Sequence, residues 1–395
     1  MYSNYTVSDF YKTFESGLTL VAGSGGMSRT ISEAGFLDYE IDPTLKDKYY
    51  HTNFQKNQLT VTTFLVAKDN PHLILDAIKY LVAKGPSGLV IKNVFKLPIH
   101  ESVLRYADSM NFPIFYVTSQ NIYVELLIFE VYKRLHILNS FRDSERCVAA
   151  ILSGNLNSDE IIKHAKELNP SITDRYYSIY VKTDEYNAPD SIDVLYNQFI
   201  SSELNIPQNC FVPYNSGAFI ICDRDSRLLP EGCISILTRN KEVFNFGISN
   251  SHSTLRDFDV CLRESLYAAS LYKSYGNNVS YGSLGSLQLI LPFADTVEMQ
   301  KFKSRVLTPI LDYDIENNSN LLQTLSAYID SNCNIDQTAK CLSQHKNTIR
   351  YRLDKITSLS GLDYKSFSDL EQLSLAIKIY NYSNSNSPEN DYDLL

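Results

Sequence analysis

The N-terminal third of the chain alternates short apolar runs with segments whose apolar residues recur at helical spacing. The apolar runs predict strands at Leu18–Ala22, Leu59–Phe64, Gly88–Lys92 and Pro113–Val117. Helical spacing predicts helices at Pro71–Lys84 and His100–Asn111, and Asn70 is expected to cap the first of them. Because strands and helices alternate, we expect an α/β layer whose sheet is at least partly parallel.

Helical spacing continues from Ile122 to Leu152, with breaks expected near Ser140 and Asp143. Beyond this connector the pattern predicts strands at Tyr176–Val181 and Val243–Ile248, a hairpin at Phe211–Cys222 and a helix at Leu255–Lys273. The hairpin is expected to turn at Asn215–Gly217. The order of strand, helix, paired strands, strand and helix favours an α+β fold.

Residues 318–382 show no strand signal, and their pattern predicts several short helices. The polar and acidic residues that follow are typical of a disordered tail. The chain is therefore predicted to be multidomain. We expect an α/β domain at residues 1–139, an α+β domain with the connector helix at 140–316, an all-α domain at 317–382 and a tail at 383–395.

Part of the helical segment has the spacing of a helix-turn-helix motif, in which a tight turn joins two short helices. The two helices are predicted at Ile335–Leu342 and Lys346–Ile356. One face of the second helix is apolar and consists of Ile349, Leu353 and Ile356. The opposite face carries Asn347, Arg350, Tyr351 and Asp354.

The charge distribution favours DNA binding by this motif. The chain of 395 residues has a formal net charge of −9, but residues 337–356 hold five basic residues and one acidic residue. Arginine suits guanine and asparagine suits adenine, so we expect Arg350 and Asn347 to reach base edges. We expect Lys346, Arg352 and Lys355 to contact phosphates, and Thr348 and Tyr351 are further DNA-contact candidates. The alternative is an amphipathic helix whose basic face is only solvated.

Other chemistry has little support in the sequence. The seven cysteines form no CxxC pair and the seven histidines show neither HxH nor HExxH spacing, so we expect no metal site and no cofactor. The segment Gly23–Gly26 lacks the Gly-Lys-[Ser/Thr] of a phosphate loop and predicts a turn. The odd number of cysteines and the absence of an apolar leader favour a cytoplasmic protein. The charged residues within Tyr123–Leu138 argue against a membrane span.

Residues His345–Leu353 resemble the signature H-[RK]-N-T-x-x-Y-R-L of the PucR/CdaR family of bacterial transcription regulators. The surrounding frame is similar to the family at Leu325–Ile329, Thr338–Ala339, Leu342, Gly361–Leu362 and Leu373–Ile377. Gln344 departs from the pattern, because an apolar residue that packs under the recognition helix is expected there. The resemblance implies a helix-turn-helix DNA-binding domain preceded by a sensor domain and a degenerate GGDEF-like domain.

The N-terminal segment resembles the PucR-type sensor domain at Leu18–Ser32, Gly88–Lys92 and Ala107–Pro113. Thr62 and Thr63 fall where that domain often has Thr-Thr-Gly, although Phe64 replaces the glycine. Lys92, at a predicted strand end, could meet an anionic effector or simply be solvated. Thr62, Thr63 and Lys92 are therefore the effector-binding candidates.

The middle segment is similar to the GGDEF-like domain of the same regulators. An active diguanylate cyclase needs a Gly-Gly-[Asp/Glu]-Glu-Phe hairpin, whose acidic residue helps to hold the metal ion at the triphosphate. The matching residues, Asn215–Phe219, include no acidic side chain. We therefore expect no cyclase activity and a structural or dimerising role.

The resemblance implies a transcription regulator, not an enzyme, that controls a catabolic or transport operon. Its expected partners are operator DNA, a small effector such as a purine derivative or another carbon or nitrogen source, and a second copy of the chain. Two alternatives stay open. One is a sensor or adaptor without DNA binding, and the other is a nucleotide-handling enzyme, which the non-acidic hairpin argues against.

Overall fold

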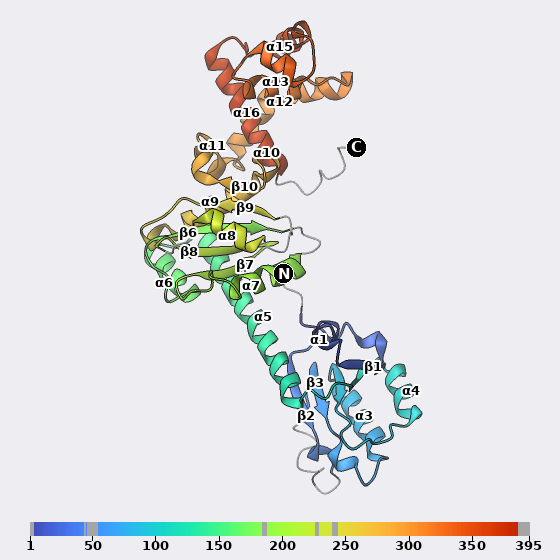
Figure 1. Ribbon diagram of the computed structural model, residues 1–395. Coiled ribbons are helices and arrows are strands. Elements are labelled where there is room, and N and C mark those ends of the chain that lie inside the picture. Colours follow the sequence, from blue (N-terminus) through green and yellow to red (C-terminus); the bar gives the residue numbers. More distant parts are fainter. Residues whose placement is uncertain are drawn as a thin grey trace. The chain divides into compact units, whose positions relative to one another are not determined.

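The computed structural model describes residues 4–42, 45, 54–183, 188–225, 229–238 and 244–385. The chain divides into two compact units, Met1–Ser144 and Glu145–Leu395 (Figure 1). The boundary falls within one long helix, α5 (Val124–Leu152). Short 3₁₀ helices lie at Ser24–Gly26, Tyr39–Ile41, Leu65–Ala67, Leu255–Asp257, Tyr281–Ser283 and Leu291–Phe293.

The first unit contains a five-stranded sheet with the order β1-β5-β4-β3-β2. Its strands are β1 (Leu18–Ala22), β2 (Glu33–Leu37), β3 (Gln58–Thr62), β4 (Gly88–Ile91) and β5 (Ile114–Val117). The strands from β2 to β5 pair in parallel, and β1 pairs with β5 in the antiparallel sense. The expectation of a partly parallel sheet is confirmed, although β2 was not among the predicted strands.

Helices cover both faces of this sheet (Figure 1). They are α1 (Val7–Phe14), α3 (Leu73–Lys84), α4 (Glu101–Ser109) and the first part of α5. One core cluster joins the sheet to α3 and α4, and another joins it to α1 and α5. The predicted start of α3 is wrong, because Asn70 and Pro71 form a turn and His72 is the N-cap.

Helix α5 is continuous, so the breaks predicted near Ser140 and Asp143 are wrong. Buried side chains lie on both sides of these positions, at Leu138, Phe141 and Val148. Packing of buried side chains commonly outweighs the weak helix propensity of individual serine and aspartate residues.

The second unit begins with a mixed α/β region whose sheet has the order β10-β9-β6-β8-β7. Its strands are β6 (Tyr176–Lys182), β7 (Cys210–Tyr214), β8 (Gly217–Asp223), β9 (Asn245–Ile248) and β10 (Asn278–Ser280). Its helices are α6 (Ser158–Leu168), α7 (Ala188–Ile200), α8 (Pro230–Leu237), α9 (Phe258–Ser270), α10 (Tyr272–Tyr275) and α11 (Leu287–Ile290). The predicted hairpin is confirmed as β7–β8, which turns at Asn215 and Ser216.

Strand β9 and helix α9 approach each other at Gly247. A Cβ atom on this residue would overlap the backbone oxygen of Ser265 and the backbone nitrogen of Ala269. The absence of a side chain at Gly247 therefore sets the distance between the sheet and the helix.

The C-terminal part is helical, as predicted. It contains α12 (Val297–Asn317), α13 (Leu321–Asp330), α14 (Ile335–Cys341), α15 (Lys346–Ser360) and α16 (Phe367–Ser385). Its core includes Val306, Leu307 and Ile310 of α12, which precedes the expected boundary at residues 316 and 317. Helix α16 continues to Ser385, and residues 386–395 of the expected tail lie outside the described residues.

Candidate DNA-binding interface

Helices α14 and α15 form the two helices that the sequence predicts for the helix-turn-helix motif. Asn334 caps α14, because its side-chain oxygen accepts hydrogen bonds from the backbone nitrogens of Asp336 and Gln337, each at 3.0 Å. His345 caps α15, since its Nδ1 accepts from the backbone nitrogen of Asn347 at 3.2 Å. His345 is thus the N-cap residue of α15.

Helix α15 presents the two faces that its sequence pattern predicts. Ile349, Leu353 and Ile356 are completely buried in the helical core. The opposite residues, Asn347, Arg350, Tyr351 and Asp354, are exposed. Tyr351 keeps 66% of its surface accessible. The face opposite the apolar residues is therefore open to solvent.

Gln344 lies in the turn between the two helices and is exposed. Its backbone nitrogen donates to the carbonyl oxygen of Ala339 at 2.9 Å, and the preceding Ser343 has a φ of 51°. The polar side chain faces water, so its departure from the family pattern buries no unsatisfied amide.

The basic candidates differ in their contacts. Lys346 Nζ lies 3.9 Å from Asp336 Oδ1 in a surface ion pair. Lys355 Nζ lies 4.4 Å from the ring centre of Tyr313. Surface pairs of this kind are weak, about 0–1 kcal/mol, so DNA phosphates can compete for these cations. Thr348 is half-buried at the edge of the same face.

Arg352 has a structural contact that the sequence pattern did not reveal. Its Nη1 donates to Thr324 Oγ1 at 3.0 Å, and Thr324 is completely buried on α13. The hydroxyl of Thr324 in turn donates to the carbonyl oxygen of Asn320 at 2.6 Å. This chain of hydrogen bonds joins α15 to α13 and so holds the recognition helix in place.

Arg352→Ala is expected to lower the free energy of unfolding of the helical part by about 1–3 kcal/mol, because it leaves the buried Thr324 hydroxyl without its donor. Arg350→Ala removes the same charge from an exposed position and should change stability by less than about 0.5 kcal/mol. Hydrogen exchange of the α13 and α15 amides, measured by mass spectrometry, compares the two variants. Equal protection in both would show that the Thr324 contact contributes nothing.

The effector candidates of the first unit are engaged in local contacts. Thr62 is completely buried, and its Oγ1 accepts from the backbone nitrogen of Phe64 at 2.9 Å. Lys92 Nζ donates to the carbonyl oxygen of Ile122 and lies 4.6 Å from the ring centre of Tyr123. Thr63 is half-buried. Phe64 has a φ of 53° and is 1% exposed, so its ring is part of the core.

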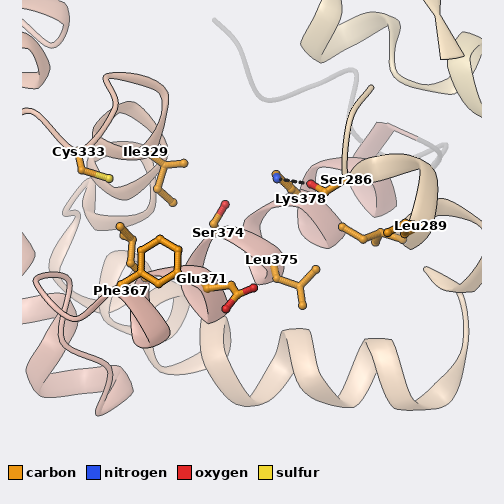
Figure 2. A pocket seen from close by; sticks show the side chains of 11 residues that line it. Ser286, Leu289, Ile329, Cys333, Phe367, Glu371, Ser374, Leu375 and Lys378 are labelled. Atoms are coloured by element: carbon orange, nitrogen blue, oxygen red, sulfur yellow. Dashed lines mark hydrogen bonds between the residues drawn. The ribbon is translucent and has the colours of Figure 1, made fainter. Parts of the chain in front are cut away.

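A hollow of about 420 Å³ lies between α11, α13 and α16 (Figure 2). Its lining is mainly apolar and includes Leu289, Ile329, Phe367 and Leu375. At one side Lys378 Nζ donates to Ser286 Oγ at 2.9 Å. The sequence pattern did not single out these residues, because they come from three helices that only the tertiary fold brings together.

Among the described helices, none is both long enough and apolar enough to cross a bilayer.

A family profile described as the PucR C-terminal helix-turn-helix domain matches residues 321–379. A second profile, described as the purine catabolism regulatory protein-like family, matches residues 11–133. The first match contains the whole α13–α15 arrangement and most of α16, and the second contains the complete N-terminal sheet.

Several relatives are similar to parts of the chain. The purine catabolism regulatory protein of Bacillus subtilis (strain 168) is 29% identical over 248 residues, which cover 56% of this chain and 46% of the relative. The proline-responsive transcriptional activator PutR of the same organism is 26% identical over 137 residues, or 34% of this chain and 33% of the relative. The carbohydrate diacid regulator of Escherichia coli (strain K12) is 38% identical over 65 residues, or 16% and 17%.

Each of these matches spans less than half of the relative's length. The two profiles nevertheless match separate parts of the chain, one toward each end, and both describe PucR-type proteins. Residues 321–379 therefore match the PucR C-terminal helix-turn-helix domain, and residues 11–133 match the purine catabolism regulatory protein-like family.

Proposed function

We propose that this protein is a sequence-specific DNA-binding transcription regulator of a catabolic or transport operon. The observation that carries the proposal is the exposed face of α15, where Asn347, Arg350 and Tyr351 stand opposite a completely buried apolar face. A helix supported in this way can enter the major groove without disturbing the core of its domain.

Within this proposal some side chains of α15 contact base edges and others contact phosphates. Arg350 and Asn347 read base edges, for which arginine and asparagine have bidentate geometry. Lys346, Arg352 and Lys355 lie toward the border of the face and fix the register through phosphates. Thr348 and Tyr351 are further DNA contacts. Arg352 has guanidinium nitrogens besides the Nη1 that bonds Thr324, and these are the ones available to a phosphate.

We further propose that the protein binds its operator as a homodimer or a higher homo-oligomer, because one helix-turn-helix reads only one half-site. Helix α5 supports this, since Leu126 and Phe129 expose apolar surface on it. We propose that a second copy of the chain packs on this surface, because an operator with two half-sites needs two helix-turn-helix motifs.

The mixed α/β region before the helical part is proposed to be a degenerate GGDEF-like domain with a structural role. In support, the turn of the β7–β8 hairpin consists of Asn215 and Ser216, followed by Gly217. None of these residues offers a carboxylate to a magnesium ion. The hairpin therefore lacks the ligand that nucleotide cyclisation needs.

A small metabolite is proposed as the effector. The names of the relatives concern purines, proline and a carbohydrate diacid, which are carbon or nitrogen sources. For the present chain Thr62, Thr63 and Lys92 remain the candidates in the N-terminal unit, with Thr63 as the one to vary first. An effector shifts the equilibrium toward the DNA-binding form only if it binds that form more tightly.

Fluorescence anisotropy with a duplex from the protein's own upstream region tests the function. Arg350→Ala is expected to weaken binding by about 1–3 kcal/mol and to relax the preference over a scrambled duplex. Arg175→Ala is the control, because it removes an exposed arginine of the α/β region that pairs with Asp225 at 3.3 Å. The affinity should also fall as salt rises. Unchanged binding by Arg350→Ala would contradict the proposed readout.

A further inference from the structure

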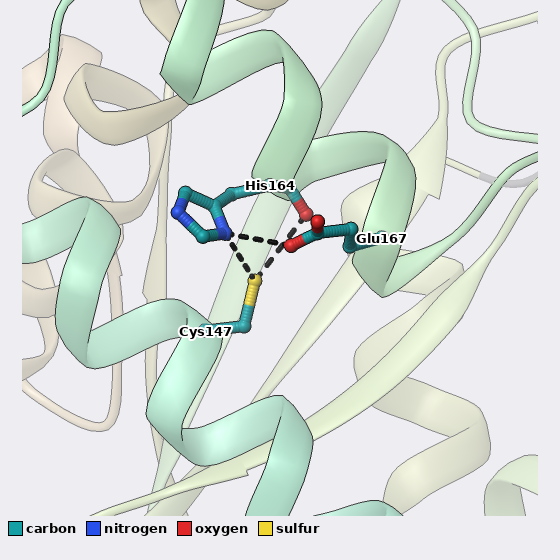
Figure 3. A group of neighbouring side chains, drawn as sticks. All are labelled: Cys147, His164 and Glu167. Atoms are coloured by element: carbon teal, nitrogen blue, oxygen red, sulfur yellow. Dashed lines mark hydrogen bonds and ion pairs between the residues drawn. The ribbon is translucent and has the colours of Figure 1, made fainter.

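Three side chains with metal-binding chemistry converge where α5 meets α6 (Figure 3). Cys147 Sγ lies 3.5 Å from His164 Nδ1, and the same nitrogen lies 2.8 Å from Glu167 Oε2. All three potential ligand atoms lie within 4.8 Å of one another. The cluster is separate from the recognition helix and from the effector candidates.

The fold holds these side chains in position. His164 and Glu167 are three residues apart on α6, so they project from one side of that helix. The α6 N-terminus is fixed by a capping box between Asn157 and Glu160. Beneath the cluster, buried residues anchor both helices to one core, namely Val148 and Ile151 of α5 and Ile161 and Ala165 of α6. The donor atoms are thus placed by packing and not by a mobile loop.

The donor set and its spacing suit a transition metal. Zinc binds cysteine at about 2.3 Å and histidine at about 2.0 Å, and a tetrahedral angle then separates these two atoms by about 3.5 Å. The observed separation of Sγ and Nδ1 is 3.5 Å. The Glu167 carboxylate needs only to turn from its hydrogen bond with His164 toward the same centre.

We propose that Cys147, His164 and Glu167 bind one divalent transition metal ion, zinc above all, with water at the fourth position. The ring of His164 and the carboxylate of Glu167 are partly exposed, at 27% and 50%, so an ion and its water can enter from the surface. Three protein ligands with one open position are a common zinc arrangement. The ion would tie the end of α5 to α6.

The hydrogen atoms of the metal-free cluster can all be placed. The Cys147 thiol donates to the carbonyl oxygen of His164 at 3.3 Å, and Nδ1–H of His164 donates to Glu167. A metal ion binds the thiolate, so binding releases the thiol proton, while the histidine proton moves to Nε2. An ion that binds sulfur strongly is needed for this exchange, which favours zinc or cobalt over magnesium or calcium.

Cobalt titration of the purified, metal-stripped full chain tests the site. We expect one equivalent of Co²⁺ to produce a thiolate-to-cobalt charge-transfer band, and one equivalent of Zn²⁺ to abolish it. Cys147→Ser should remove the band, and His164→Gln or Glu167→Gln should weaken Co²⁺ binding at least about tenfold. Cys341→Ser is the control, because it removes an exposed thiol elsewhere and should leave the titration unchanged.

Thermal unfolding gives a second, independent readout. Zn²⁺ should raise the melting temperature of the wild-type chain but not that of Cys147→Ser, whose folding is verified by its far-ultraviolet circular dichroism. The proposal is overturned if the folded wild-type chain takes up no stoichiometric Co²⁺. It is equally overturned if the band survives in Cys147→Ser or disappears in Cys341→Ser. None of these outcomes depends on DNA binding.

Discussion

Phe64→Ala is expected to lower the free energy of unfolding of the N-terminal unit by about 3–5 kcal/mol. The ring is 1% exposed and belongs to a core cluster with Leu37, Ile74 and Ile78. Its removal leaves a cavity between the sheet and the helices that cover it. Urea unfolding followed by circular dichroism measures the loss. Leu65→Ala serves as the control, because Leu65 follows Phe64 directly and is 43% exposed.

Phe64→Gly should be less harmful than Phe64→Ala by about 1 kcal/mol, although glycine is the smaller residue. The reason is the backbone, whose φ of 53° lies in the left-handed region that favours glycine. This chain keeps a conformation that suits glycine and fills the neighbouring space with a ring. A greater loss for glycine than for alanine would contradict this explanation.

Gly247→Ala is expected to destabilise the second unit by more than about 3 kcal/mol, or to prevent its folding. The new methyl group would overlap backbone atoms of Ser265 and Ala269, and the helix backbone cannot rotate away as a side chain can. To make room, β9 and α9 must separate along their whole contact. The yield of soluble protein and the melting temperature measure the effect.

Gly361→Ala is the matched control for this substitution. A Cβ atom at Gly361 meets nothing within 4 Å, and its φ of 73° is left-handed, so alanine there adds only backbone strain of about 1 kcal/mol. A clear gap between the two variants identifies the steric contact as the cause. Similar melting temperatures for both would show that β9 and α9 can move apart easily.

The recognition helix could be predicted in detail because its signals are local. The spacing of Ile349, Leu353 and Ile356 defines the buried face within three turns of one helix. The strands β1, β3, β4 and β5 were predicted for a similar reason, since each is a short apolar run. The capping box of Thr6 and Asp9 is a local signal of the same kind and marks the start of helix α1.

Features that depend on distant parts of the chain could not be predicted. Arg352 was expected at phosphate, but its hydroxyl partner Thr324 lies 28 residues away on another helix. Strand β2 contains a glutamate and a glycine and resembles a loop until it pairs with β3. Cys147 and His164 are separated by 17 residues, so no spacing rule for metal ligands would bring them together.

Helix α16 takes part in two cores. Its residues Leu373 and Ala376 pack in the helix-turn-helix core, whereas Ile379 and Tyr382 pack with Leu271 near α10 and α11. A fragment that stops at residue 379, where the family match ends, cuts this helix and loses Tyr382 from the second core. The helix-turn-helix part therefore does not end at a clean domain boundary. A chimaera that exchanges this part should include α10 and α11, so that Ile379 and Tyr382 keep their packing partners.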